Sequence, residues 1–131
     1  MRLCALRGCP RGCDRLDGGD GLAHAARMDT LARLELTIAE RRKAAPDESY
    51  VASLAARGLP VIARKLGEEA VEAVVAALTD NREELIGEAA DVLFHLLVLL
   101  AEKGISLSEV LAELDGREGM SGLAEKAARG M

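Results

Sequence analysis

Two long segments of helical pattern, joined by a short polar turn, constrain the fold of this chain most strongly. The first spans about residues 60–79, the second spans about residues 82–103, and Asp80-Asn81 lies between them. No segment alternates with a period of two residues. The chain has one Phe, one Tyr and no Trp, whereas strands are enriched in aromatic residues. We therefore predict an all-α fold, an antiparallel helical bundle of four to five helices in which the two long segments are the longest.

Residues that commonly begin and end helices define the remaining elements. Pro60 suits the first turn of the first long helix, and Gly104 follows the end of the second. Either Asp80 or Asn81 can cap the second long helix at its start. The shorter helices are expected at Thr30–Lys43 after a cap at Asp29, at Ser49–Ala56 before Gly58, at Ser106–Leu114 with a Ser106–Glu109 capping box, and at Leu123–Arg129.

Residues 1–27 differ from the rest of the chain. They show no helical or strand periodicity and lack the apolar stretch of a secretory signal. We interpret them as a disordered or non-native extension and place the domain at residues 28–131. All three cysteines lie in this extension, so a disulfide framework is excluded and a reducing cytoplasm is the expected location. A metal site built from Cys4, Cys9, Cys13 and His24 is the alternative, although the spacing lacks paired CxxC ligands.

Charge and hydropathy limit the classes of partner. With 22 acidic and 17 basic residues the chain has a net charge of -5, which disfavours a nucleic-acid binder. The most apolar run, Val92–Ala101, has ten residues, whereas a membrane span needs about 20. The apolar residues near this run offer more surface than one small domain covers, so we predict a homodimer. They are Val92, Leu96, Leu99, Leu100, Leu107, Val110 and Leu111.

Two acidic clusters lie on the two long helices. Glu68, Glu69 and Glu72 fall within one arc of about 100° on the first helix. Glu88 and Asp91 are three residues apart and share a face of the second. Any one of these glutamates can be an ordinary exposed residue, but Asp91 directly precedes the apolar run, where an unpaired carboxylate is costly.

An antiparallel hairpin places the two clusters at the same height. Counted from the turn at Asp80-Asn81, both lie about 11 Å along their helices. Carboxylates gathered at one level repel each other unless a cation lies between them. Oxygen ligands select a hard ion, Mg²⁺ or in its place Mn²⁺, and Mg²⁺ commonly keeps positions for substrate phosphate.

The spacing of the carboxylates and the sequence around them resemble those of a known family. Glu69-x-x-Glu72, 15 residues, then Glu88-x-x-Asp91 resembles the ExxE and ExxD signature of the all-α, MazG-like nucleoside triphosphate pyrophosphohydrolases. Three blocks are similar to the phosphoribosyl-ATP pyrophosphohydrolases of histidine biosynthesis. These blocks span residues 49–77, 88–114 and 117–130.

The resemblance implies hydrolysis of 1-(5-phosphoribosyl)-ATP to 1-(5-phosphoribosyl)-AMP and pyrophosphate, the second step of L-histidine biosynthesis. It implies that Mg²⁺ is held by Glu69, Glu72, Glu88 and Asp91. Glu68 is then a candidate to position or deprotonate the attacking water. A cyclohydrolase, which follows in the pathway, is expected on a separate chain.

Several further residues have two interpretations each. Lys65 can contact a phosphate or pair with Glu69, and His95 can support the acidic site or be a hydrogen-bonded core residue. Lys126 and Arg129 can add positive charge for a phosphate beside Ser121-Gly122, or belong to a frayed helix. Gly67 and Gly87 can mark close helix approach beside the clusters, or occur there by chance.

Two other functions stay open at this point. A MazG-type housecleaning enzyme that hydrolyses other nucleoside triphosphates would use the same carboxylates. A non-catalytic helical dimerisation module would have no need for acidic residues that face each other beside a core.

Overall fold

The computed structural model describes residues 20–118, 126–127 and 129–130, and this part of the chain contains five α-helices and no strand. The order is α1 (Asp20–Arg41), α2 (Tyr50–Arg57), α3 (Leu59–Leu78), α4 (Arg82–Lys103) and α5 (Leu107–Arg117). The predicted all-α class is confirmed. None of the described helices combines the length and the apolar character that a membrane crossing requires.

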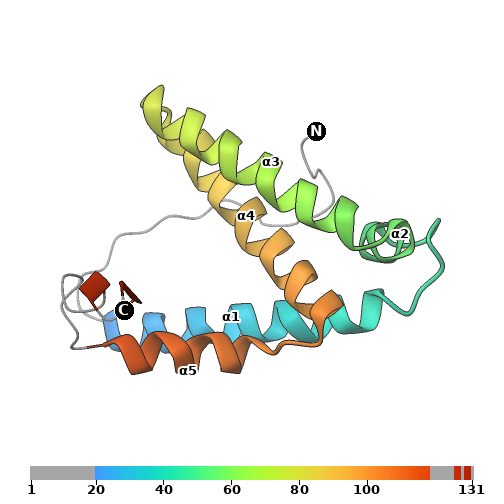
Figure 1. Ribbon diagram of the computed structural model, residues 1–131, viewed down its shortest axis with the longest axis horizontal. Coiled ribbons are helices and arrows are strands. Elements are labelled where there is room, and N and C mark those ends of the chain that lie inside the picture. The colour runs from blue at the N-terminus through green and yellow to red at the C-terminus, as the bar shows by residue number, and fades with distance from the viewer. Residues whose placement is uncertain (1–19, 119–125, 128, 131) are drawn as a thin grey trace.

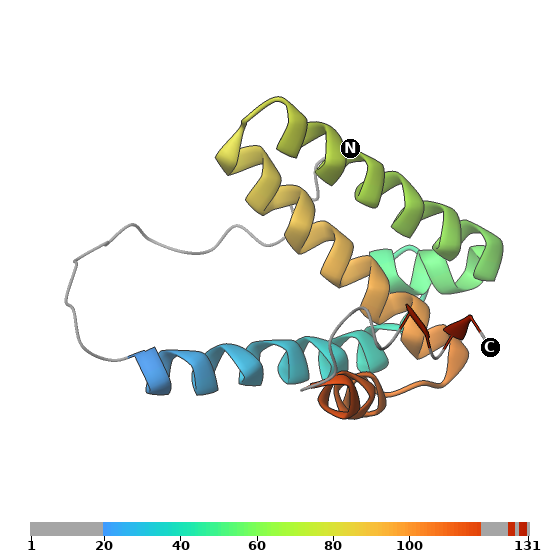
Figure 2. The same ribbon diagram turned by 60° about the vertical axis from the view of Figure 1, so that its left-hand side comes forward.

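Helices α3 and α4 form an antiparallel hairpin that extends away from α1 (Figures 1 and 2). The Asn81 side chain caps α4 by accepting a hydrogen bond from the Glu84 backbone N–H. Asn81 is thus the cap among the two candidates that the sequence offered. Asp80 instead adopts a positive φ of 54°, which turns the chain between the helices. Gly104 closes α4 in the left-handed conformation, where a residue without Cβ avoids strain.

Three of the other predicted helix ends are confirmed. The Ser49 side chain caps α2, Gly58 ends it, and Ser106 and Glu109 form the capping box of α5. Helix α5 continues three residues beyond the predicted end, to Arg117. Most of the helix predicted at residues 123–129 lies outside the described residues.

The predicted start of the first helix is wrong. Helix α1 begins at Asp20, so Asp29 lies within the helix and does not cap it. Residues 22–41 contain neither Gly nor Pro and are rich in Ala, Leu and Arg, so nothing interrupts the helix there. With 22 residues α1 equals α4 and exceeds α3, which has 20, so the two hairpin helices are not the two longest.

The core lies where α1 and α2 meet one end of the α3–α4 hairpin. Its buried side chains are Ile38, Val51, Leu54, Ile62, Phe94, Leu97 and Val98. The Glu35 carboxylate of α1 accepts a hydrogen bond from the Leu107 backbone N–H and thereby joins α5 to this end. The other half of the hairpin, toward Asn81, extends beyond the core.

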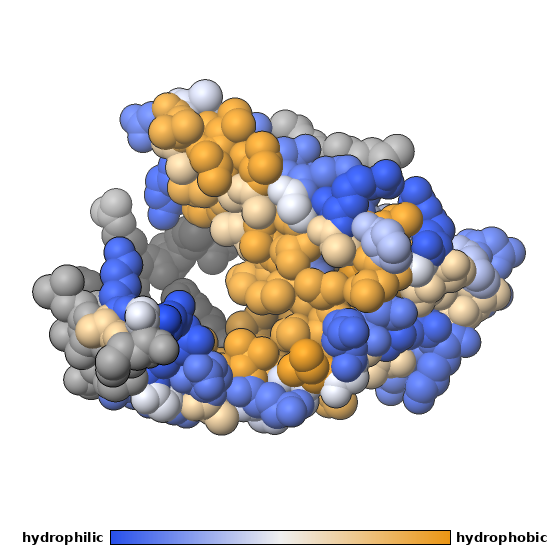
Figure 3. All heavy atoms as spheres, in the orientation of Figure 1, coloured by the Kyte–Doolittle hydropathy of each residue, from blue (hydrophilic) through white to orange (hydrophobic). Residues whose placement is uncertain are grey.

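That outer half exposes apolar side chains. In Figure 3 the hydrophobic surface covers the end of the hairpin and continues across the middle of the molecule. The exposed hairpin residues are Val71, Val74, Val75, Leu78, Ile86 and Leu93. The predicted apolar stripe is a different set, and all seven of its residues are half-buried within this chain. Since they keep part of their surface exposed, their contribution to a contact with a second subunit stays a prediction.

Candidate active site

Three carboxylates from the hairpin converge where its outer half joins the core. Glu69 comes from α3, and Glu88 and Asp91 come from successive turns of α4. One oxygen of each lies within 4.8 Å of the other two. The antiparallel pairing of α3 and α4 thus brings Glu69 together with residues that are 19 or more positions away in the chain. The sequence predicted this meeting, because the acidic clusters of the two helices lie equally far from the turn.

The three carboxylates have little access to water. Glu69 is only 7% exposed, and Glu88 and Asp91 are half-buried. Oε2 of Glu88 is buried and has no hydrogen-bond partner among the described residues. Because an unsatisfied buried carboxylate oxygen is costly, this atom is a place where a proton, a water or a cation would bind favourably.

The pKa values of the cluster follow from this burial. Burial raises the pKa of Glu69, and the charges of Glu72 and Asp91 raise it further against the opposing effect of Lys65. Burial also raises the pKa of Glu88, and the nearby Glu72 carboxyl, which can share its proton, adds to the rise. The cluster therefore favours a bound positive charge, as mutually repelling carboxylates do.

Glu72 and Glu68 lie at the margin of the cluster. Glu72 is exposed, and although it raises the pKa of both neighbouring glutamates, it is not one of the three with converging oxygens. Three of the four predicted metal ligands are therefore close together, and Glu72 adjoins them.

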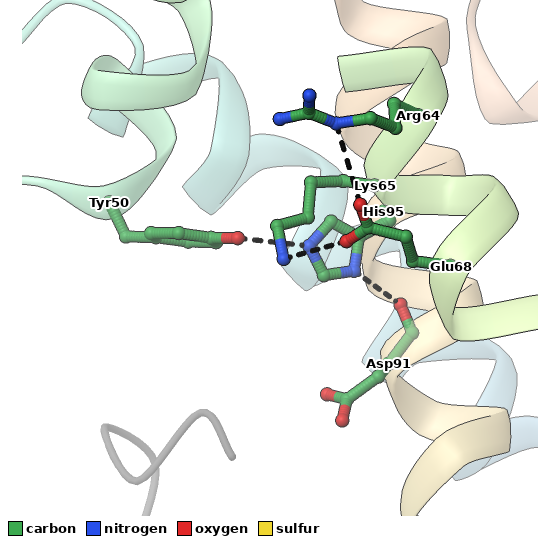
Figure 4. Close-up of polar contacts among 6 residues, drawn as sticks. All are labelled: Tyr50, Arg64, Lys65, Glu68, Asp91 and His95. Atoms are coloured by element: carbon green, nitrogen blue, oxygen red, sulfur yellow. Dashed lines mark hydrogen bonds and ion pairs between the residues drawn. The ribbon is translucent and has the colours of Figure 1, made fainter. Parts of the chain in front are cut away.

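Glu68 pairs with two basic residues of its own helix (Figure 4). Its carboxylate lies 3.0 Å from Nζ of Lys65 and 3.4 Å from Nε of Arg64. The hydrogen bond from Lys65 holds the pKa of Glu68 below its usual value. Lys65 thus pairs with Glu68, whereas the sequence suggested Glu69 as its partner.

His95 is a fully buried histidine with both ring nitrogens hydrogen-bonded. Nδ1 lies 2.9 Å from the Asp91 carbonyl oxygen, and Nε2 lies 3.2 Å from the Tyr50 hydroxyl (Figure 4). The expected core histidine bonded to a neighbouring helix is confirmed, and its bond to the Asp91 carbonyl also connects it to the acidic site. Sequence analysis did not identify Tyr50, although it is the only tyrosine in the chain.

The glycines beside the clusters do not mark close helix approach within this chain. A Cβ added to Gly67 or Gly87 would meet nothing within 4 Å. Lys126 and Arg129 are exposed, and their part in phosphate binding stays a prediction. Ser121 and Gly122 lie outside the described residues.

A cavity lies beside α1 in the described part of the chain. It has a volume of about 300 Å³ and is lined mostly by residues of α1, together with Val51 and Phe94. None of its lining residues is acidic. The carboxylate cluster, and not this cavity, is therefore the candidate active site.

A helical hairpin whose ExxE and ExxD motifs gather carboxylates beside the core is the arrangement of the all-α nucleoside triphosphate pyrophosphohydrolases. Residues 31–118 match the family model described as phosphoribosyl-ATP pyrophosphohydrolase. The chain belongs to this family.

Curated relatives cover almost the same part of the chain. The phosphoribosyl-ATP pyrophosphatase of Erythrobacter litoralis is 67% identical over 103 residues, which are 79% of this chain and 99% of that protein. The protein of the same name from Rhizorhabdus wittichii is 66% identical over 76% of this chain and 94% of its own. The phosphoribosyl-ATP pyrophosphatase of Zymomonas mobilis is 59% identical over 77% of this chain and 94% of its own length.

Proposed function

We propose that this chain hydrolyses 1-(5-phosphoribosyl)-ATP to 1-(5-phosphoribosyl)-AMP and pyrophosphate, as the second step of L-histidine biosynthesis in the cytoplasm. The observation that supports this most directly is the cluster of Glu69, Glu88 and Asp91 in a chain of this family. The reaction adds one water across a phosphoric anhydride, and its site must offset the charge of a triphosphate and orient the water. Both tasks suit the residues of the cluster.

The donor set fits a divalent cation. Every group that converges is a carboxylate, and the buried Oε2 of Glu88 lacks a partner. Hard oxygen donors favour Mg²⁺, with Mn²⁺ as a substitute. We assign Glu69, Glu88 and Asp91 as the residues that would hold the ion, with Glu72 as a fourth ligand from its adjoining position. When bound, the ion would neutralise phosphate charge and polarise the anhydride.

Residues around the cluster would bind and orient the reactants. Lys65 is close enough to the carboxylates to offer its ammonium group to a phosphate, and the pairing with Glu68 keeps that group charged. Glu68 stays ionised because its pKa is lowered, so its carboxylate can accept a hydrogen bond from the attacking water. A lowered pKa makes Glu68 a weak base. We therefore assign it the role of orienting the attacking water and not mainly that of removing a proton from it. Lys126 and Arg129 would add positive charge for phosphate from the C-terminal segment.

We also infer a homodimer. The outer half of the hairpin carries six exposed large aliphatic residues that no other described element covers. An uncovered apolar surface of this kind marks a protein interface. Gly87 on this half, and Gly67 beside its junction with the core, leave open space on the helix surface that a second hairpin can approach.

The decisive experiment is pyrophosphate release from 1-(5-phosphoribosyl)-ATP, measured against a panel of nucleoside triphosphates with and without Mg²⁺. We expect turnover of the first substrate alone and only with the ion. Preferential turnover of ordinary nucleotides would support the housecleaning alternative. In Glu72→Gln and Asp91→Asn variants the enzyme should lose turnover, whereas a dimerisation module would keep or gain stability and have no activity to lose.

A further inference from the structure

Tyr50 is fixed to the candidate active site through a single side chain. It begins α2, and its hydroxyl lies 3.2 Å from Nε2 of His95 on α4. Nδ1 of the same ring lies 2.9 Å from the Asp91 carbonyl, which can only accept, so Nδ1 carries the hydrogen. In the neutral ring Nε2 must then accept, and the Tyr50 hydroxyl donates to it. One imidazole thus connects Tyr50 to the backbone of a proposed metal ligand.

The Tyr50 ring is held firmly and yet remains partly open to solvent. The Phe94 ring stacks on it at 22°, with ring centroids 6.3 Å apart, and His95 presents an edge at 6.1 Å. Phe94 and His95 are buried, but Tyr50 is 40% exposed. Its neighbours therefore fix the orientation of the ring without covering it.

The ring lies on the side of the molecule where the reacting groups are. In Figure 4 the hydroxyl of Tyr50 points toward Lys65 and His95, above the Asp91 carboxylate. The charges of Lys65, Glu69 and Asp91 all act on this hydroxyl, whose pKa is raised mainly by burial. The ring is therefore within reach of a molecule whose triphosphate lies at the carboxylates.

We propose that the exposed part of the Tyr50 ring stacks against the purine base of the substrate, and that His95 is the positioning residue that holds the ring in place. The inference rests on the proposed function, because it assigns the binding of the base in that same substrate. Stacking of a base on an aromatic side chain is a favourable and common mode of recognition. Phe94 is the only Phe and the chain has no Trp, so Tyr50 is the one exposed aromatic ring that the sequence offers.

Tyrosine fluorescence tests the contact directly. Since the chain has one Tyr and no Trp, its emission reports on Tyr50 alone. The full chain with Mg²⁺ is titrated with 1-(5-phosphoribosyl)-AMP, which contains the base, and separately with ribose 5-phosphate and pyrophosphate, which do not. We expect quenching by the first ligand only. Unchanged emission at a concentration of 1-(5-phosphoribosyl)-AMP that inhibits turnover would overturn the proposal.

Kinetic variants give a second measurement. Tyr50→Leu should raise the KM for 1-(5-phosphoribosyl)-ATP by about tenfold, with a smaller change in kcat and no change in inhibition by pyrophosphate. Tyr50→Phe, which keeps the ring, should stay within about threefold of the wild-type KM. A fall in kcat at unchanged KM in both Tyr50→Phe and Tyr50→Leu would instead give the hydroxyl a chemical role and refute base stacking by the ring.

The role of His95 is tested by rescue. His95→Leu should raise KM as Tyr50→Leu does, and His95→Gln, whose side-chain oxygen can accept from the hydroxyl, should restore part of the loss. Ile105→Ala is the matched control, because Ile105 is also 40% exposed but lies beyond the far end of α4. A wild-type protein that releases no pyrophosphate would refute the proposed function itself. An active wild type whose Tyr50→Leu variant keeps its KM would refute the base contact alone.

Discussion

Glu69 on α3 and Glu88 on α4 hold carboxylate oxygens within 4.8 Å of each other beside the core, without a basic side chain between them among the described contacts. Lys65, which is nearest along α3, pairs with Glu68 instead. Repulsion between the two glutamates is therefore only partly offset, by the more distant charge of Lys65, in the protein without a cation. This relationship leads to the first two predictions.

Magnesium should stabilise the folded protein. A cation that binds the cluster and hardly binds the unfolded chain adds about 1.4 kcal/mol to the free energy of unfolding at ten times its dissociation constant. The melting temperature should rise with Mg²⁺ but not with Na⁺ at the same ionic strength. The rise should disappear in Asp91→Asn together with pyrophosphate release. If that variant keeps the Mg²⁺ shift but loses activity, Asp91 acts outside the metal shell.

Acidic conditions should stabilise the metal-free cluster. The pKa of Glu88 is raised above its ordinary value of 4.5, so the folded protein binds this proton more tightly than the unfolded chain. The stabilising contribution is complete below 4.5 and is lost as the pH rises through the raised pKa. Without metal, Glu88→Gln should therefore melt at a higher temperature than wild type at neutral pH, and at the same temperature below 4.5. Equal melting temperatures at neutral pH would show that Glu88 is not strained by its neighbours.

Glu68 should affect turnover without affecting metal binding. Its carboxylate is exposed and paired with Lys65, outside the three converging groups. Glu68→Gln should lower kcat by about 100-fold, because the attacking water would lose the carboxylate that orients it, and keep the Mg²⁺-dependent melting shift. Loss of that shift would place Glu68 among the metal ligands. Arg64→Gln, which removes its other ion-pair partner, serves as the control and should leave kcat nearly unchanged.

The exposed face of the hairpin should be the dimer interface. Sedimentation at micromolar concentration should show a dimer for the wild type. Val74→Lys should give a monomer, because a charge would be buried in an apolar contact. Leu36→Lys on α1 is the control, since Leu36 is 67% exposed but lies on another helix. A wild-type monomer, or a dimer that persists in Val74→Lys, would refute the interface.

A chain that begins at Met28 should keep full pyrophosphohydrolase activity. Residues 31–118 contain the whole family match and every residue of the acidic cluster. The test compares kcat and KM of the shortened and full-length chains. Loss of activity would support a functional site at Cys4, Cys9 and Cys13.

Local sequence chemistry predicted most helix ends, because each depends on residues close in the chain. The side chains of Asn81 and Ser106 cap their helices through bonds that span three residues, and Gly104 needs only its own backbone freedom. The start of α1 was missed for a related reason. Asp29 is a good cap residue, but helix-forming residues precede it and nothing there forces the helix to begin.

The sequence by itself determined the two acidic motifs, their equal distances from the turn and therefore the meeting of Glu69 with Glu88 and Asp91. These follow from helical rise and the length of the connection, which are properties of the local chain. Only the tertiary structure decided that Oε2 of Glu88 is buried without a partner and that His95 binds Tyr50. Such contacts depend on how α2 and α3 pack against α4, because burial and side-chain direction are set by neighbours distant in sequence. The same packing leaves Val71 and Leu78 exposed, which periodicity alone could not distinguish from a buried face.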